Sequence, residues 1–194
     1  MTAPAAVLRL MQNLRVHLPG AVDSGIILEL FNTLNEFFTV TRCWREEIEV
    51  TALAATLAYT LTPTDPGTII SLMSLTNEND TPVAGSMQVP GTLDFVNQPN
   101  VGDVFTAEVA LTVVDPVDAD AYPEFPDWLM EKYYAGIMSG VLGKMMAQPA
   151  KVYSNERMAV YHTRSFRGAM ANARAEARHK NLYRGQRWTY PGFA

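Results

Sequence analysis

The side chains most often used for catalysis and metal binding are few in this chain and far apart. The three histidines, His17, His162 and His179, and the single cysteine, Cys43, do not share the spacing of a metal site. Ser139 stands in the segment Gly-Ile-Met-Ser-Gly, which lacks the spacing of a nucleophile elbow. We therefore expect no catalytic residues, no cofactor and no metal, and we predict that the protein is not an enzyme.

Two groups of carboxylates could hold a proton or a cation. Glu46, Glu47 and Glu49 are interpreted as a solvated strand edge, because nothing nearby would separate their pKa values as an acid–base pair requires. A second group could offer oxygen ligands to Ca²⁺, but the ligand order and the glycine of an EF-hand are absent, which favours a solvated linker. Its members are Asp115, Asp118, Asp120, Glu124 and Asp127.

Cys43 and His162 each permit a structural and a functional interpretation. Cys43 follows an apolar run and is expected to be a small buried hydrophobe, although the flanking Arg42 and Arg45 leave a reactive thiolate open. His162 falls on a predicted helix face of Ala and Phe, where we expect a hydrogen-bonded histidine of the core or of an interface. One thiol cannot form an internal disulfide, so we expect the chain to be made in a reducing cytoplasm.

The strongest chemical signal lies in the C-terminal 14 residues. Aromatic residues and arginine dominate interface hot spots, and large aromatic side chains on an extended arm are costly to leave in water. The arm could dock on its own subunit or on a partner, and nucleic-acid bases could also stack between its aromatic residues. The residues concerned are Tyr183, Arg184, Arg187, Trp188, Tyr190 and Phe193.

The net charge of −5 conceals a division along the chain. Residues 1–143 hold 5 Lys or Arg and 18 Asp or Glu, whereas residues 144–194 hold 10 and 2. This asymmetry predicts an interaction arm, or else one Arg-rich amphipathic helix, and the acidic body would oppose phosphate binding. No apolar run reaches the ~18 residues of a transmembrane helix, and polar residues interrupt the N-terminal apolar stretch, so we predict neither a membrane span nor a signal peptide.

Periodicity and breakers predict an α+β fold, in which an antiparallel-type helical bundle carries a small inserted β-domain. Residues 1–44 should form N-terminal helices, residues 45–114 the β-domain, residues 115–180 C-terminal helices and residues 181–194 an extended arm. We expect helices at 5–18, 24–39, 127–147 and 155–181, and strands at 40–61, 68–76, 87–89, 93–96 and 104–114.

Three patterns make the expected packing specific. Leu8, Met11, Leu14 (or Arg15) and Leu18 should lie near one face of the first helix, and alternate residues from Phe105 to Val113 should share a face of the last strand. Gly136, Gly140 and Gly143 lie at helical spacing and each costs about 1 kcal/mol relative to Ala. We therefore expect a neighbouring helix or strand to approach the helix closely there.

From residue 100 onward the chain resembles the head-to-tail connector adaptors of tailed bacteriophages, chiefly the short-tailed ones. The resemblance is carried by an ordered series of segments and by the basic aromatic ending. The segments are Pro126-Asp-Trp-Leu129, Gly140-Val-Leu-Gly-Lys-Met-Met146, Pro149-Ala-Lys-Val-Tyr-Ser154, Met158-Ala-Val-Tyr161, Phe166 and Ala171-Asn-Ala-Arg-Ala-Glu-Ala177. None of them is a chemical signature, and residues 1–99 match only in layout.

The resemblance implies a virion structural protein of the neck. It implies a ring of identical subunits, twelve-fold, bound beneath the portal protein, with the tail nozzle or tail tube below and DNA passing through the lumen. The C-terminal residues would clasp the portal through Arg174, Arg178, Arg184, Arg187, Trp188, Tyr190 and Phe193. The alternative is a nucleic-acid-binding packaging accessory protein.

Overall fold

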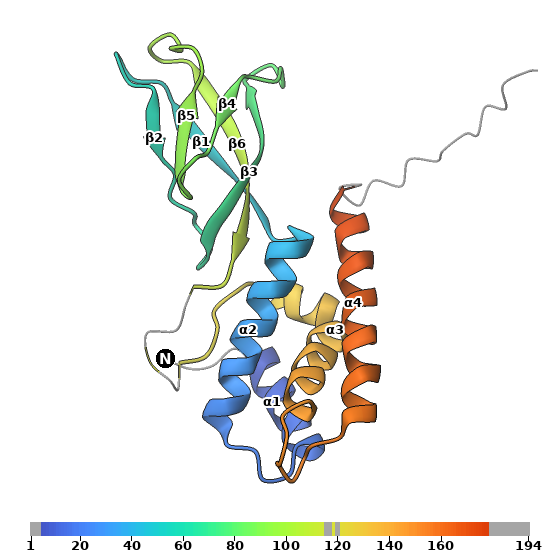
Figure 1. Cartoon of the computed structure of the whole chain (residues 1–194). Helices are drawn as coiled ribbons and strands as arrows, with labels where there is room; N and C mark the ends of the chain where they lie inside the picture. Colours follow the sequence, from blue (N-terminus) through green and yellow to red (C-terminus); the bar gives the residue numbers. More distant parts are fainter. Residues whose placement is uncertain (1–4, 115–117, 119–120, 179–194) are drawn as a thin grey trace, which may run out of the picture.

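The computed structural model describes residues 5–114, 118 and 121–178, and within them the chain is α+β (Figure 1). Four helices and two small antiparallel sheets are present in this part of the chain. The helices lie together at one end of the molecule and the strands at the other (Figure 1). Helices α1 (Ala5–His17) and α2 (Asp23–Thr41) precede the strands, and α3 (Asp127–Met146) and α4 (Glu156–Arg178) follow them.

The strands form two sheets of three strands each. The first has the order β1-β6-β3 and contains β1 (Arg45–Thr51), β3 (Thr68–Asn77) and β6 (Val104–Thr112). The second has the order β2-β5-β4 and contains β2 (Ala58–Thr60), β4 (Gly85–Ser86) and β5 (Thr92–Phe95). In the first sheet Arg45 pairs with Ala110 across β1 and β6, while the register of β3 against β6 shifts twice.

The predicted elements are largely confirmed, with differences at short strands and at element ends. The expected strand at residues 87–89 is wrong, because the chain instead pairs at Gly85–Ser86. The strands expected within 40–61 are present as β1 and β2, but they begin later than predicted, because residues 40 and 41 still belong to α2 and pairing starts at Arg45. Helix α4 follows the prediction to Arg178, and the rest of the predicted helix lies outside the described residues.

The two predicted apolar faces are confirmed except at one residue of the first helix. Met11, Leu14 and Leu18 are buried as predicted. Leu8 is 41% exposed, and Val7 and Leu10 instead complete the buried face of α1 toward α3. In β6 the predicted alternate residues are buried, but so are Glu108, Ala110 and Thr112 on the other face. Strand β6 is central in its sheet and also contacts α2, so both of its faces are covered.

The expected close approach at the helical glycines is confirmed. A Cβ added to Gly136 would lie 2.6 Å from the Cβ of Ala169, and one added to Gly140 would collide with Thr33 and lie 2.8 Å from the Phe166 ring. A Cβ on Gly143 would lie 2.9 Å from the hydroxyl of Thr163. We call this contact the α3–α4 seam, since α4 supplies most of the facing atoms and α2 adds Thr33.

An aromatic cluster joins the helices to the base of the strands. The Phe37 ring lies 5.1 Å from that of Tyr133 and 6.1 Å from that of Phe166, measured between centroids. Phe38 contacts Trp44 at 5.3 Å, and Trp44 donates its indole N–H to Asp65 at 3.2 Å. Because the indole lies just ahead of β1, the cluster fixes where the first sheet leaves the helices.

Candidate arginine-lined interface

Four arginines from three parts of the chain meet around one hollow of about 330 Å³. Arg42 follows α2, Arg45 begins β1, and Arg174 and Arg178 lie near the end of α4. Figure 1 shows that these element ends lie where the helices meet the strands. We call this feature the arginine hollow; Met73 of β3 and residues 39–41 complete its lining.

Arg42 ends α2 with an unusual backbone conformation. Its φ of 52° and ψ of 37° are left-handed, and its N–H donates to the Phe38 carbonyl at 2.8 Å. A non-glycine residue costs roughly 1–2 kcal/mol in this conformation. The turn redirects the chain into β1, and the Nε–H of Arg45 then donates to the Arg42 carbonyl at 2.9 Å. The turn therefore places two arginines on one side of the hollow.

Arg45 is the most firmly held of the four arginines. Its guanidinium donates to a carboxylate oxygen of Glu108 at 3.0 Å, and the hydroxyl of Ser74 donates to the other oxygen at 2.9 Å. The side chains of Arg45 and Glu108 are only 17% and 11% exposed. Glu108 thus balances one positive charge at the hollow and fixes the position of that guanidinium.

Arg174 and Arg178 lie one helical turn apart, so they project from the same face of α4. Both side chains are exposed, and neither forms a salt bridge with a described carboxylate. The same holds for Arg42, whereas Glu176 of α4 pairs with Lys132 at 2.9 Å. Three guanidinium groups therefore face the hollow without a described carboxylate partner.

Guanidinium groups suit one kind of ligand chemistry. Each presents a planar fork of N–H donors that matches a carboxylate or a phosphate with two parallel hydrogen bonds. Four such groups around a concave surface offer donors that could bind an anionic group. Of the portal-binding residues predicted from the sequence, the structure brings Arg174 and Arg178 to this hollow.

The other predicted portal-binding residues lie outside the described part of the chain. They are Arg184, Arg187, Trp188, Tyr190 and Phe193. The sequence did not predict that Arg42 and Arg45 would lie beside Arg174; it singled them out only as neighbours of Cys43. No periodicity links residues some 130 positions apart, and no glycine in the sequence marks the left-handed turn at Arg42.

Cys43 fits the structural interpretation better than the reactive one. The thiol is partly buried, and burial raises its pKa, while the Thr41 hydroxyl 3.1 Å away acts weakly in the opposite direction. A raised pKa favours the neutral thiol over the thiolate, which is the reactive form. The flanking Arg42 and Arg45 instead line the arginine hollow.

His162 differs from the expectation that it would be hydrogen-bonded. Its Nδ1 atom is buried and has no hydrogen-bond partner within the described residues, so the structure does not support a hydrogen-bonded histidine of the core, and the interface role stays a prediction. Burial lowers the pKa of His162, and the nearby His17 lowers it further. The neutral imidazole is therefore favoured in the folded chain.

Within the described residues, the two carboxylate groups do not gather into a second site. Glu46 accepts the backbone N–H groups of Thr64 at 2.6 Å and Asp65 at 3.3 Å, so it anchors a loop. Across the described ranges, no three His, Cys, Asp or Glu side chains lie close enough to hold a metal ion; Asp115 and Asp120 lie outside those ranges. No helix of the described chain is both long and apolar enough to cross a bilayer.

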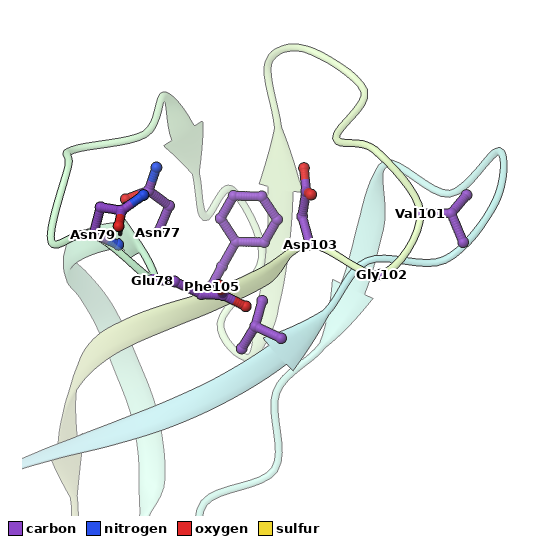
Figure 2. Close-up of a pocket in the computed structure, with 8 residues that line it drawn as sticks. Asn77, Glu78, Asn79, Val101, Gly102, Asp103 and Phe105 are labelled. Carbon is purple, nitrogen blue, oxygen red and sulfur yellow. Dashed lines mark hydrogen bonds between the residues drawn. The ribbon is translucent and has the colours of Figure 1, made fainter.

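A second hollow, of about 450 Å³, lies among the loops at the far end of the strands (Figure 2). Figure 2 shows Phe105 between the side chains of Asn77 and Asp103. The polar groups already serve the loops: Asn77 accepts two backbone N–H groups, and Asp103 accepts the backbone and side-chain N–H groups of Asn100. This hollow is therefore a weaker candidate than the arginine hollow.

Comparison of the chain with models of known protein families and with curated proteins finds no match to either.

Proposed function

We propose that the chain is a non-enzymatic structural protein of a tailed-phage virion, the adaptor that joins the capsid portal to the tail. The observation that carries the proposal is the arrangement of α3 and α4. The segment that resembles connector adaptors contains this closely packed helix pair, and its arginine-bearing end leads directly to the basic aromatic C-terminus. The insertion of the strands between two pairs of helices supports the same proposal.

In this proposal the four helices act as an antiparallel-type bundle and form the wall of a twelve-fold ring. The strands project from that wall, and the arm predicted for residues 181–194 lies outside the described residues. The ring lies in the neck of the virion, beneath the portal protein and above the tail nozzle or tail tube. The chain would be made in the host cytoplasm before assembly.

The charge distribution supports DNA as passing cargo rather than as a bound partner. Residues 46–131 contain 15 Asp or Glu and no Lys or Arg. Tight binding of DNA relies on several basic side chains that neutralise successive phosphates. A channel that must let the genome pass gains from a wall that does not bind phosphate, and the basic residues near the C-terminus are left for the portal.

The test combines truncation with portal binding. A chain ended after Asn181 is compared with the full chain in a pull-down by the portal protein of the same genome and in the yield of tailed particles. We expect the truncation to weaken portal binding and to reduce that yield. Wild-type assembly by the truncated chain, together with wild-type assembly by Ala substitutions at Arg174 and Arg178, would refute the proposed anchor.

A further inference from the structure

We infer that the arginine hollow is a binding site for the carboxylate side chains of an extended, acidic protein segment. The inference deepens the proposed function, on which it rests only for the identity of the partner: the portal protein would carry the segment. The chemistry of the site depends on Arg42, Arg45, Arg174 and Arg178 alone.

The arginine hollow carries an excess of positive charge. Glu108 is paired with Arg45, and Arg42, Arg174 and Arg178 have no salt bridge to a described carboxylate. Like charges four residues apart on a helix, as at Arg174 and Arg178, repel each other and destabilise it. An incoming anion would remove that repulsion and provide the missing partners.

One guanidinium group of the hollow is held in place without a ligand. Arg45 is shielded from solvent and is held by Glu108 and by the Arg42 carbonyl before any ligand arrives. A guanidinium that is already fixed loses little side-chain entropy on binding. Arg45 can therefore act as the fixed point of the site, while the exposed arginines of α4 close on the ligand from the other side.

The shape and charge of the hollow favour a peptide over nucleic acid as its ligand. The hollow is concave, about 330 Å³ in volume, and partly lined by Val40 and Met73, which suits the stem of an acidic side chain. Duplex phosphates lie on a convex surface, and DNA-binding proteins usually spread their basic residues along a stripe. Here β1 continues from Arg45 directly into Glu46, Glu47 and Glu49, which would repel a longer polyanion.

Occupation of the hollow would couple α4 to α2, β1 and β3. Arg174 and Arg178 belong to α4, Arg42 ends α2, and Met73 belongs to β3. A peptide bound between them would tie the end of α4 to the junction of helices and strands. We therefore expect slower amide hydrogen exchange at the last turns of α4 when the ligand is present.

The experiment uses the full chain and a fluorescent hexaglutamate peptide, with binding followed by anisotropy. We expect saturable binding that weakens as salt rises, and a loss of about tenfold in affinity for Arg174→Gln or Arg178→Gln, as suits a charge-assisted hydrogen bond. Arg157→Gln is the matched control, because Arg157 lies on α4 but does not line the hollow. It should bind the peptide as the wild type does.

Two results would overturn the inference. One is an equal loss of affinity in Arg157→Gln and Arg174→Gln, which would indicate a diffuse charge effect. The other is tighter binding of a DNA duplex or of inorganic phosphate than of hexaglutamate. A portal pull-down with the same variants separates the two proposals: retained portal binding without peptide binding refutes the site alone, whereas peptide binding without portal binding refutes the assigned partner.

Discussion

The α3–α4 seam and the arginine hollow both lie on α4, and they make opposite demands on its side chains. At the seam, Phe166 and Ala169 face glycines so closely that no added atom fits. At the hollow, Arg174 and Arg178 are exposed and unpaired with any described carboxylate. The seam provides packing that the fold needs, whereas the exposed charges of Arg174 and Arg178 have no such role in the described structure. Substitutions should therefore separate stability from binding along this helix.

The largest effect should come from the aromatic cluster behind the seam. Phe37 is fully buried between Tyr133 and Phe166, so Phe37→Ala should lower the free energy of unfolding by ~3–5 kcal/mol. Denaturant unfolding followed by circular dichroism measures the loss. Leu28→Ala on the same helix is the control, because Leu28 is 55% exposed, and it should cost less than ~0.5 kcal/mol. Equal losses would contradict the proposed core.

A single methyl group tests the seam itself. Gly140→Ala adds a Cβ that collides with Thr33 and Phe166, and overpacking of this kind costs ~1–3 kcal/mol. Gly168→Ala makes the same change in α4 where nothing lies within 4 Å, and it should raise stability by ~0.5–1 kcal/mol through helix propensity. The two variants should therefore shift the unfolding midpoint in opposite directions, and a shift in the same direction would contradict the seam.

A smaller effect should depend on pH through His162. Burial and then His17 lower its pKa below the ordinary value of 6.5, so the unfolded chain takes up the proton first as the pH falls. This contribution to stability is complete above the unfolded pKa and is lost as the pH drops below it. His162→Gln should consequently lose less stability than the wild type between about pH 7.5 and pH 5.5. An equal loss in both proteins would assign the pH dependence to other groups.

The smallest effect on stability should be found at the hollow. Arg174→Gln removes an exposed charge with no described carboxylate partner, so unfolding should change by less than ~0.5 kcal/mol. The same variant should lose affinity for hexaglutamate. A loss of stability comparable to that of Gly140→Ala would show that Arg174 serves the fold and would end the contrast between the two regions.

The seam could be predicted from the sequence because its signal is local. Gly136, Gly140 and Gly143 recur at helical spacing, and three costly residues in one helix indicate a close neighbour. Leu8 was misplaced because both stripes of α1 are apolar at similar spacing, and only the contact with α3 decides between them. The short strand at Gly85–Ser86 was missed because its pairing depends on β5 rather than on its own composition.

The arginine hollow could be predicted only in part. Arg174 and Arg178 follow from the charge asymmetry and from the resemblance. Arg42 and Arg45 are brought to them by a left-handed turn and by the packing of α4 against α2, which are tertiary effects. A sequence pattern within one helix or strand cannot predict a site whose residues come from several elements.

The most direct test of the central proposal is electron cryomicroscopy of purified tailed particles made by the genome that encodes this chain. The account predicts a twelve-fold ring of density between portal and tail into which residues 5–114 and 121–178 fit, with the arginine hollow facing the portal. A neck without this chain, or particles that attach tails normally when its gene is deleted, would contradict the account.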